Sequence, residues 1–181
     1  LIVNDCTDLA YRADASLYTA DFFRQVRAHL GPGGIGAAWV PLRSEAPHRV
    51  LRSVMASFAA AFDHVSLWVF DAQPAHFGIL VGADRPVVAD LDRLRRALVP
   101  GPVRSDLEEV SLADPWRLAA SRQLDDAAVR AFCRQSPLHT DDRPVVEFEA
   151  PLEAGDDAST YAFLQAAGDG SLAPVPPAVR R

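Results

Sequence analysis

Lysine is absent from this chain of 181 residues, so all 18 of its basic side chains are arginine, against 24 aspartates and glutamates. The net charge of −6 argues against a nucleic-acid interface, because such an interface needs a basic patch. That charge suits a small cationic partner. Cysteine is scarce as well, since Cys6 and Cys133 stand far apart and match no metal-ligand spacing. We therefore expect free thiols, a reducing compartment and no bound metal.

Long hydrophobic runs are also missing. Hydrophobic residues make up 49% of the chain, yet no run approaches the roughly 20 apolar residues that cross a bilayer. The length suffices for one domain with a sizeable core. The chain starts with leucine and has one methionine, Met55, and its opening resembles neither a signal peptide nor a tag. We expect the chain to be a piece of a longer protein. This piece would be cytoplasmic and could be tethered to a membrane through other parts of that protein.

The first residues present a short apolar run followed by acids. Leu1-Ile2-Val3 leads through Asn4 into Asp5, and Asp8 follows three residues later. This pattern predicts a buried strand over residues 1–6. Ligands of open α/β sheets bind at the carboxyl ends of strands, so Asp5 and Asp8 are candidate site residues. The alternative is that both acids only cap a turn.

Hydrophobic periodicity and turn residues predict the remaining elements. Further strands are expected over 35–40, 64–70 and 77–81, the first covered on both faces and the last two forming an antiparallel pair at one sheet edge. Helices are expected after Thr19, from Pro47, from Pro86, from Asp114 and from 125–126. Residues 9–18 are expected to form a loop, Pro100-Gly101-Pro102 a break between helices, and 138–149 an extended segment.

Three segments together carry a resemblance to a known family. They are Asp5-Cys6-Thr7-Asp8 with Ser16–Phe23, then Leu30-Gly31-Pro32-Gly33-Gly34, and finally Leu138–Phe148 with its Thr-Asp-Asp-Arg-Pro run. In this order they resemble the C-terminal half of the catalytic domain of spermidine synthases, the polyamine aminopropyltransferases. The resemblance is greatest to the bacterial branch that is fused to membrane segments or helical repeats, and it extends to about residue 151.

The element order and this resemblance imply one architecture. We expect an α/β fold, the C-terminal half of a Rossmann-like class I methyltransferase fold, over residues 1–84, with parallel strands and an antiparallel edge strand. A helical extension with a closing segment would occupy 85–150, and a linker or tail 151–181. The Gly-rich nucleotide loop and the ribose-binding acid of the family would precede Leu1.

The resemblance implies transfer of an aminopropyl group from decarboxylated S-adenosylmethionine to a small-molecule amine. It makes Asp5 the catalytic base. It also makes Asp8, Tyr18 and His76 amine-binding residues, and Asp5 and Cys6 contacts to the co-substrate. No other cofactor is implied, and the N-terminal half of the parent domain would hold most of the co-substrate. That half would be the segment's partner, and the segment alone is expected to be inactive because the nucleotide-binding half is missing. A homodimer is a further expectation.

Each site residue also has a structural interpretation. Tyr18 and Cys6 fit packing positions, His76 fits an ordinary surface histidine, and Trp39 and Trp68 fit the core. The Asp141-Asp142-Arg143 run fits either a solvated turn or a lid edge near the amine.

Two alternative functions remain open at this point. One is an S-adenosylmethionine-dependent methyltransferase, and the other is a degenerate scaffold domain. The chain lacks the Tyr that diamine-using members carry in the segment matching 71–76, which favours the scaffold.

Overall fold

The structure is a computed structural model that describes residues 1–5, 9, 12–42, 48–70 and 77–152. The described strands are β1 (Ile2–Asn4), β2 (Ile35–Pro41), β3 (His64–Trp68), β4 (Phe77–Ala83) and β5 (Arg122–Leu124). The described α-helices are α1 (Arg12–Ala15), α2 (Ala20–His29), α3 (Arg49–Ala59), α4 (Leu91–Ala97), α5 (Pro102–Glu109), α6 (Pro115–Ala120), α7 (Asp126–Phe132) and α8 (Val145–Glu149). Two 3₁₀ turns, η1 (Ser16–Tyr18) and η2 (Ala150–Leu152), complete the described elements.

The five strands form one mixed sheet in the order β1-β2-β4-β3-β5. β1 and β2 are parallel, and β4 is antiparallel to both of its neighbours, so β1, β2 and β3 run in the same direction. The antiparallel pairing of the strands on either side of 71–76 is confirmed. Their expected place at a sheet edge is wrong, because β4 lies between β2 and β3, and the short β5 pairs with the far side of β3.

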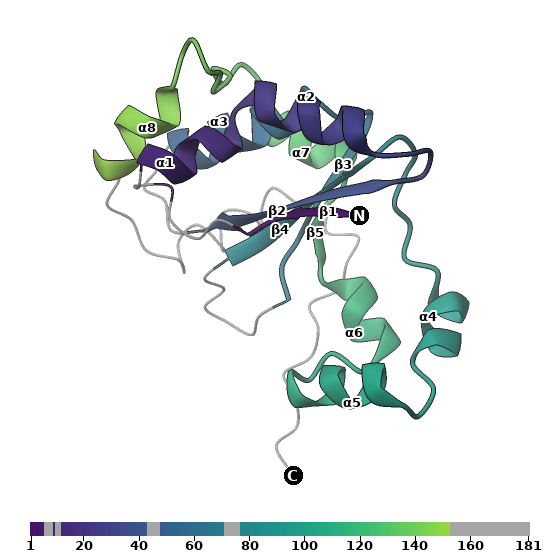
Figure 1. Ribbon diagram of the computed structural model, residues 1–181. Helices are drawn as coiled ribbons and strands as arrows, with labels where there is room; N and C mark the ends of the chain where they lie inside the picture. The colour runs from purple at the N-terminus through teal and green to yellow at the C-terminus, as the bar shows by residue number, and fades with distance from the viewer. Residues whose placement is uncertain (6–8, 10–11, 43–47, 71–76, 153–181) are drawn as a thin grey trace.

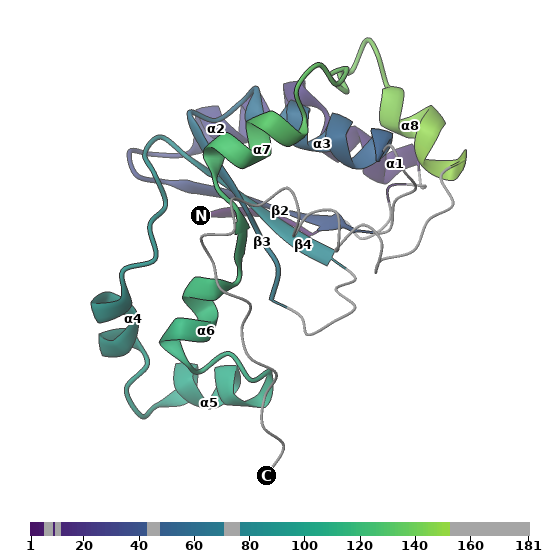
Figure 2. The same cartoon turned by 180° about the vertical axis from the view of Figure 1, so that it is seen from behind.

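Five helices, α1, α2, α3, α7 and α8, lie together on one side of the sheet (Figure 1 and, from behind, Figure 2). Alternate residues of β2 and β4 face this layer and are buried, which gives the core its sheet side. The helix side is aromatic, with Phe23, Phe58 and Phe62 in successive ring contacts of 4.9 and 4.7 Å between centroids. The core therefore lies between one face of the sheet and a single helix layer.

Two glycines let the Phe62 ring lie directly on the sheet. Gly36 and Gly82 are partners in the β2–β4 register. A methyl group added at Gly82 would lie 2.5 Å from Phe62 Cγ, and one added at Gly36 would lie 2.5 Å from Phe62 Cζ. Both distances are far below van der Waals contact, so these two positions require residues without a side chain.

Helix caps expected from the sequence are present. Thr19 accepts a hydrogen bond from the Phe22 N–H at 3.1 Å at the start of α2, and Asp125 accepts one from Ala128 N–H at 2.9 Å at the start of α7. Asp114 caps α6 in the same way, through Trp116 N–H. Local hydrogen-bonding chemistry therefore decides where these three helices begin.

Three sequence expectations are wrong. The expected loop 9–18 contains α1 and η1, and the helix expected from Pro86 begins only at Leu91, where Asp90 caps it. The expected break at 100–102 is confirmed, since α4 ends at Ala97 and α5, which the sequence did not predict, begins at Pro102. Pro102 occupies the first turn of α5, where the missing N–H has no partner to lose. The expected extended segment 138–149 ends in α8, whose Val146 is fully buried.

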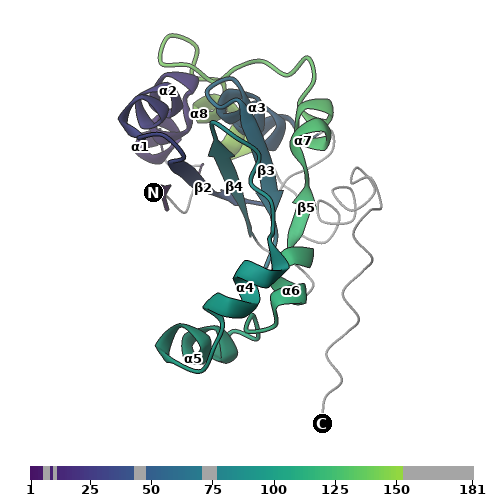
Figure 3. The same cartoon turned by 90° about the vertical axis from the view of Figure 1, so that its right-hand side faces the viewer.

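Helices α4, α5 and α6 form an arm (residues 86–120) that extends away from the sheet and its helix layer (Figure 3). The sequence predicted a helical extension in this part of the chain. No helix among the described residues is long and apolar enough to cross a bilayer.

Candidate functional site

The carboxyl end of β1 is where the sequence placed the catalytic acid. Asn4, the last strand residue, is 7% exposed and donates a hydrogen bond from Nδ2 to the Leu17 carbonyl at 2.8 Å. This bond ties the strand end to η1. Asp5 follows directly and is exposed, and its carboxylate makes no hydrogen bond or ion pair with the described part of the chain. A carboxylate held at a strand end and open to solvent can accept a proton or hold a cation.

A half-buried aromatic strip lies at the same level of the sheet. Asn4 is paired with Ala38, so the chain at Asp5 runs beside Trp39 of β2. The Trp39 ring stacks on Phe77 with centroids 5.7 Å apart and the planes 27° from parallel. Ile79 separates Trp39 from Trp68 in the sheet register, which extends the apolar row across three strands.

This strip corrects the expectation for β2. The sequence predicted a strand covered on both faces, with Trp39 and Trp68 in the core. Instead β2 alternates between buried and half-buried residues, and both tryptophans are only half-buried. Because the residues of β2 are apolar or small on both faces, the hydrophobic pattern of its sequence does not reveal which face is half-exposed.

His139 connects the last of the three segments that carry the resemblance, residues 138–148, to the segment at residues 12–23. The His139 Nε2–H donates to the Ala15 carbonyl at 2.7 Å, and the His139 carbonyl accepts from Ala20 N–H at 2.8 Å. The His139 backbone N–H donates a further hydrogen bond to Ser57 Oγ of α3 at 2.8 Å. Residues 138–148 and 12–23 are thereby held together near the end of β1, although more than a hundred residues separate them.

Burial lowers the pKa of His139, which is 1% exposed, below the ordinary histidine value. The hydrogen bond to Ala15, the Arg143 backbone and the nearby charges of Glu147 and Asp141 oppose that effect only in part. The imidazole is therefore neutral near pH 7, with its proton on Nε2.

The Asp141-Asp142-Arg143 run forms an exposed turn. Thr140 and Arg143 exchange backbone hydrogen bonds at 3.1 Å, and Thr140 Oγ1 also accepts from Arg143 N–H at 3.0 Å. The Asp141 N–H donates to Asp21 Oδ2 at 3.1 Å, which anchors the turn to the start of α2. This geometry fits the solvated-turn interpretation.

Tyr18 lies fully inside the core. Its exposed fraction is 0%, and its hydroxyl donates to the Trp39 carbonyl at 2.6 Å. The packing interpretation therefore accounts for Tyr18 in this conformation, where a ligand in solvent does not reach it. Asp8, Cys6 and His76 lie outside the described residues, so their expected roles stay predictions.

A cavity of about 300 Å³ lies at the opposite end of the sheet. Its polar lining includes His64, Arg122, Asp125 and Asp126. His64 begins β3 and pairs with Ala83, about four residues along the strands from the level of Asp5, or roughly 13 Å. None of the described candidate residues lines this cavity.

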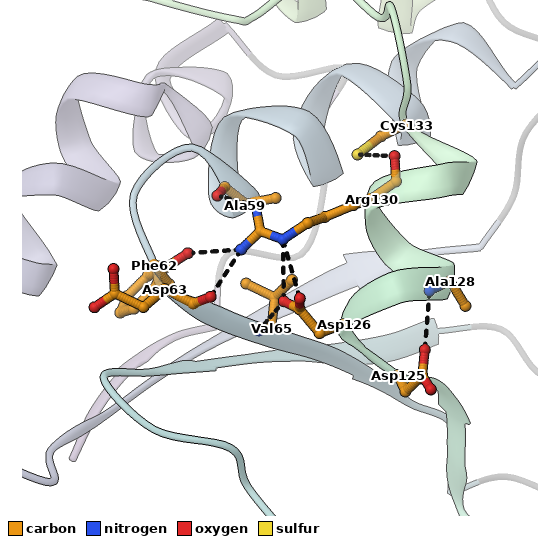
Figure 4. Close-up of polar contacts among 9 residues, drawn as sticks. All are labelled: Ala59, Phe62, Asp63, Val65, Asp125, Asp126, Ala128, Arg130 and Cys133. Atoms are coloured by element: carbon orange, nitrogen blue, oxygen red, sulfur yellow. Dashed lines mark hydrogen bonds and ion pairs between the residues drawn. The ribbon is translucent and has the colours of Figure 1, made fainter.

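Asp126 on the wall of this cavity already has structural partners (Figure 4). Its Oδ1 accepts from the Val65 N–H at 2.9 Å, and Arg130 Nε bonds both of its oxygens. Burial raises the pKa of Asp126, but the bonds from Arg130 and Val65 lower it more, and the net pKa lies below the ordinary value. The carboxylate is thus a fixed anion that holds α7 to β3.

Among the described residues, no group of three histidine, cysteine, aspartate or glutamate side chains is placed to hold a metal ion. The described candidate site consists of the exposed Asp5 carboxylate and the aromatic strip beside it. Residues 138–148 are hydrogen-bonded to residues 12–23, which adjoin the end of β1. In comparisons with known proteins, no family model and no curated protein matches the chain.

Proposed function

We propose that the chain is the second half of a spermidine-synthase-like domain that transfers an aminopropyl group to an amine. The observation that carries this proposal is the position of Asp5, an exposed carboxylate at the carboxyl end of β1 and level with Trp39. An alkyl amine has a pKa of about 10, so it reaches the site protonated and must lose a proton before it can attack. Asp5 is suited to bind the ammonium and accept that proton.

The proposed step balances as a simple displacement. The amine nitrogen, freed of one proton by the Asp5 carboxylate, attacks the methylene carbon bonded to the sulfonium sulfur of decarboxylated S-adenosylmethionine. A C–N bond forms and the C–S bond breaks, and its electron pair leaves on sulfur as the neutral thioether methylthioadenosine. The aromatic strip at Trp39 and Phe77 supports the proposal, because aromatic faces attract both alkyl chains and cations.

The sheet supports the finer fold assignment. The order β1-β2-β4-β3, with three strands in one direction and β4 reversed between two of them, is the order expected for the second half of a Rossmann-like methyltransferase fold. Sheets made only of parallel strands carry helices on both faces. This sheet has one parallel pair, β1–β2, and no described strand pairs with the outer edge of β1, where Val3 is 57% exposed. The described helices α1, α2, α3, α7 and α8 share one face (Figure 1). A further strand and helix layer from the parent domain would complete both.

The test uses the longer protein that contains this segment. We expect it to release methylthioadenosine from decarboxylated S-adenosylmethionine when a di- or polyamine is present. Asp5→Asn should lower kcat by about a hundredfold or more, because general-base catalysis contributes on that scale. Asp63→Asn, an exposed acid at the other end of the sheet, should leave the rate unchanged.

Methyl transfer is the second candidate, because the strand order supports it equally. It does not need an acid that holds an ammonium, so ordinary S-adenosylmethionine should then be consumed and Asp5→Asn should be silent. That pair of results would overturn the aminopropyl assignment. Absence of turnover with either co-substrate would favour the scaffold alternative.

A further inference from the structure

The cavity at the start of β3 is bounded by four separate parts of the chain. Its lining comes from residues 64–66 of β3, from Pro86 and Val87 after β4, from Arg122 of β5 and from residues 125–127 at the start of α7. Its volume of about 300 Å³ is at the lower end of the range for small-molecule sites. A ligand here would bind the polar atoms on these walls that have no partner inside the protein.

One charge of each sign lines the cavity without an ion pair. Arg122 is half-buried, and its guanidinium makes no hydrogen bond or ion pair with any residue that the structure describes. Asp125 is also half-buried and caps α7 through Oδ1, whereas its Oδ2 has no partner within the same ranges. The neighbouring Asp126 differs, because Arg130 and the Val65 N–H already bind its oxygens (Figure 4). Arg122 and Asp125 are thus the described charges on these walls that a ligand can use.

Uncharged groups add hydrogen-bonding capacity and an apolar wall. Ser66 is 5% exposed, and its Oγ accepts from Trp68 Nε1–H at 2.9 Å, while no described acceptor takes its own hydroxyl proton. The His64 ring has no hydrogen bond with the described residues, and a neutral imidazole donates through one nitrogen and accepts through the other. Pro86 and Val87 supply the apolar side. The cavity therefore combines two opposite charges with a small apolar surface.

The two charges are separated by about the length of a small molecule. Arg122 and Asp125 are three residues apart on extended chain, which places their Cα atoms about 10 Å apart. Both side chains line the cavity, so a ligand between them has less than that distance to span. Arginine binds a carboxylate through paired N–H donors, and an aspartate oxygen accepts from an ammonium. A small zwitterion satisfies both at once.

We propose that this cavity binds a free α-amino acid with an aliphatic side chain. The carboxylate of the ligand lies against Arg122 and the Ser66 hydroxyl, the ammonium against Asp125 Oδ2, and the side chain against Val87. A ligand with a single charge would leave the opposite charge on the wall without a partner, which costs binding free energy. The inference shares no residue with the Asp5 region, so it does not depend on the chemistry proposed there.

Isothermal titration calorimetry of the 181-residue chain with L-leucine tests the proposal. We expect binding with a Kd of about 1 mM or lower. Two analogues each lack one charge of leucine: 4-methylpentanoate has no ammonium, and 3-methylbutylamine has no carboxylate. Each should bind at least about tenfold more weakly, because one charge on the wall stays unpaired. No detectable binding of L-leucine, or equal binding of either analogue, would overturn the proposal.

Matched substitutions then locate the bound amino acid. Asp125→Asn removes the charge but keeps a residue that caps helices equally well, and Arg122→Gln removes the opposite charge. Each should raise the Kd for L-leucine at least about tenfold. Asp114→Asn, the same change at the cap of α6, and Arg134→Gln, at an exposed site just after α7, should leave the Kd unchanged.

A third variant fills the cavity without touching either charge. Val87 lies outside the helices and strands, so Val87→Trp should abolish L-leucine binding and leave the fold intact. Circular dichroism of every variant verifies the fold, and Val87→Trp decides the question if a charge variant unfolds. Native affinity in folded Asp125→Asn, Arg122→Gln or Val87→Trp would place the amino acid elsewhere and overturn the assignment.

Discussion

Arg130 and Asp126 pair one helical turn apart on α7, where the Arg130 Nε–H is shared between the two carboxylate oxygens at 3.2 and 3.1 Å. The other guanidinium nitrogens of Arg130 donate to the carbonyls of Ala59, Phe62 and Asp63 at 3.0–3.1 Å. A single cation therefore covers the last carbonyls of α3 and the turn into β3, where the helix dipole favours positive charge.

Arg130→Ala should lower the free energy of unfolding by about 1–3 kcal/mol, because several carbonyls lose a charged donor. Arg130→Lys should recover only part of that loss, since a lysine ammonium lacks the planar fork of N–H donors with which arginine reaches all of these acceptors. Urea denaturation followed by circular dichroism measures both. Arg134→Ala, at an exposed site, is the control, and equal losses in the Arg130 and Arg134 variants would refute the assigned role.

Gly82→Ala should destabilise the chain by about 1–3 kcal/mol, because its new methyl group meets the Phe62 ring. Gly31→Ala is a matched control, since a methyl group there meets nothing within 4 Å. Combining Gly82→Ala with Phe62→Leu should cost less than the sum of the two single changes, because the smaller side chain relieves the clash. Additive losses would mean that the ring and the glycine do not interact.

The free energy of unfolding should fall as the pH drops below about 6.5. Burial lowers the pKa of His139 in the folded chain, so the unfolded chain takes up a proton first and gains stability relative to the folded one. The loss should continue until the pH reaches the lowered pKa. His48 contributes in the same direction, since burial followed by the charge of Arg52 lowers its pKa too.

The comparison that isolates His139 uses denaturation at about pH 7.5 and about pH 5.5. His139→Gln should show a smaller difference in unfolding free energy between the two conditions than the native chain does. His29→Gln, at an exposed position, should keep the native difference. An unchanged difference in His139→Gln would contradict the buried neutral assignment.

Tyr18→Phe separates packing from substrate binding at Tyr18. Losing the hydroxyl removes the hydrogen bond from Tyr18 to the Trp39 carbonyl, so we expect a loss of about 1–2 kcal/mol in stability. Amine affinity of the longer protein, measured by calorimetry, should not change. A weaker amine affinity with unchanged stability would instead place Tyr18 in the binding slot.

Local chemistry was readable from the sequence, and long-range placement was not. Thr19, Asp114 and Asp125 cap helices through bonds to residues two or three positions ahead, so their spacing alone predicted those helix starts. β5 escaped prediction because it has only three residues and exists through its pairing with β3. The helical state of α8 depends on burying Val146 against the rest of the core, which no local pattern encodes.

The candidate site divides in the same way. The position of Asp5 at the end of a strand followed from one apolar run and one acid. The half-exposed row through Trp39 and Ile79 did not, because a strand of apolar residues reads alike whether one face or both are covered. The contact of His139 with Ala15 spans 124 positions and had no sequence signal.

The insertion of β4 between β2 and β3 sets the order in which a chain leaving the ribosome can assemble its sheet. β2 is synthesised after its parallel neighbour β1, but its antiparallel neighbour β4 arrives only after α3 and β3 have been made. A hairpin of β3 and β4 can close first because its contacts are local, whereas joining it to β2 must close a much longer loop. Nascent chains halted before Phe77 would therefore leave the β4-facing edge of β2 without its partner strand.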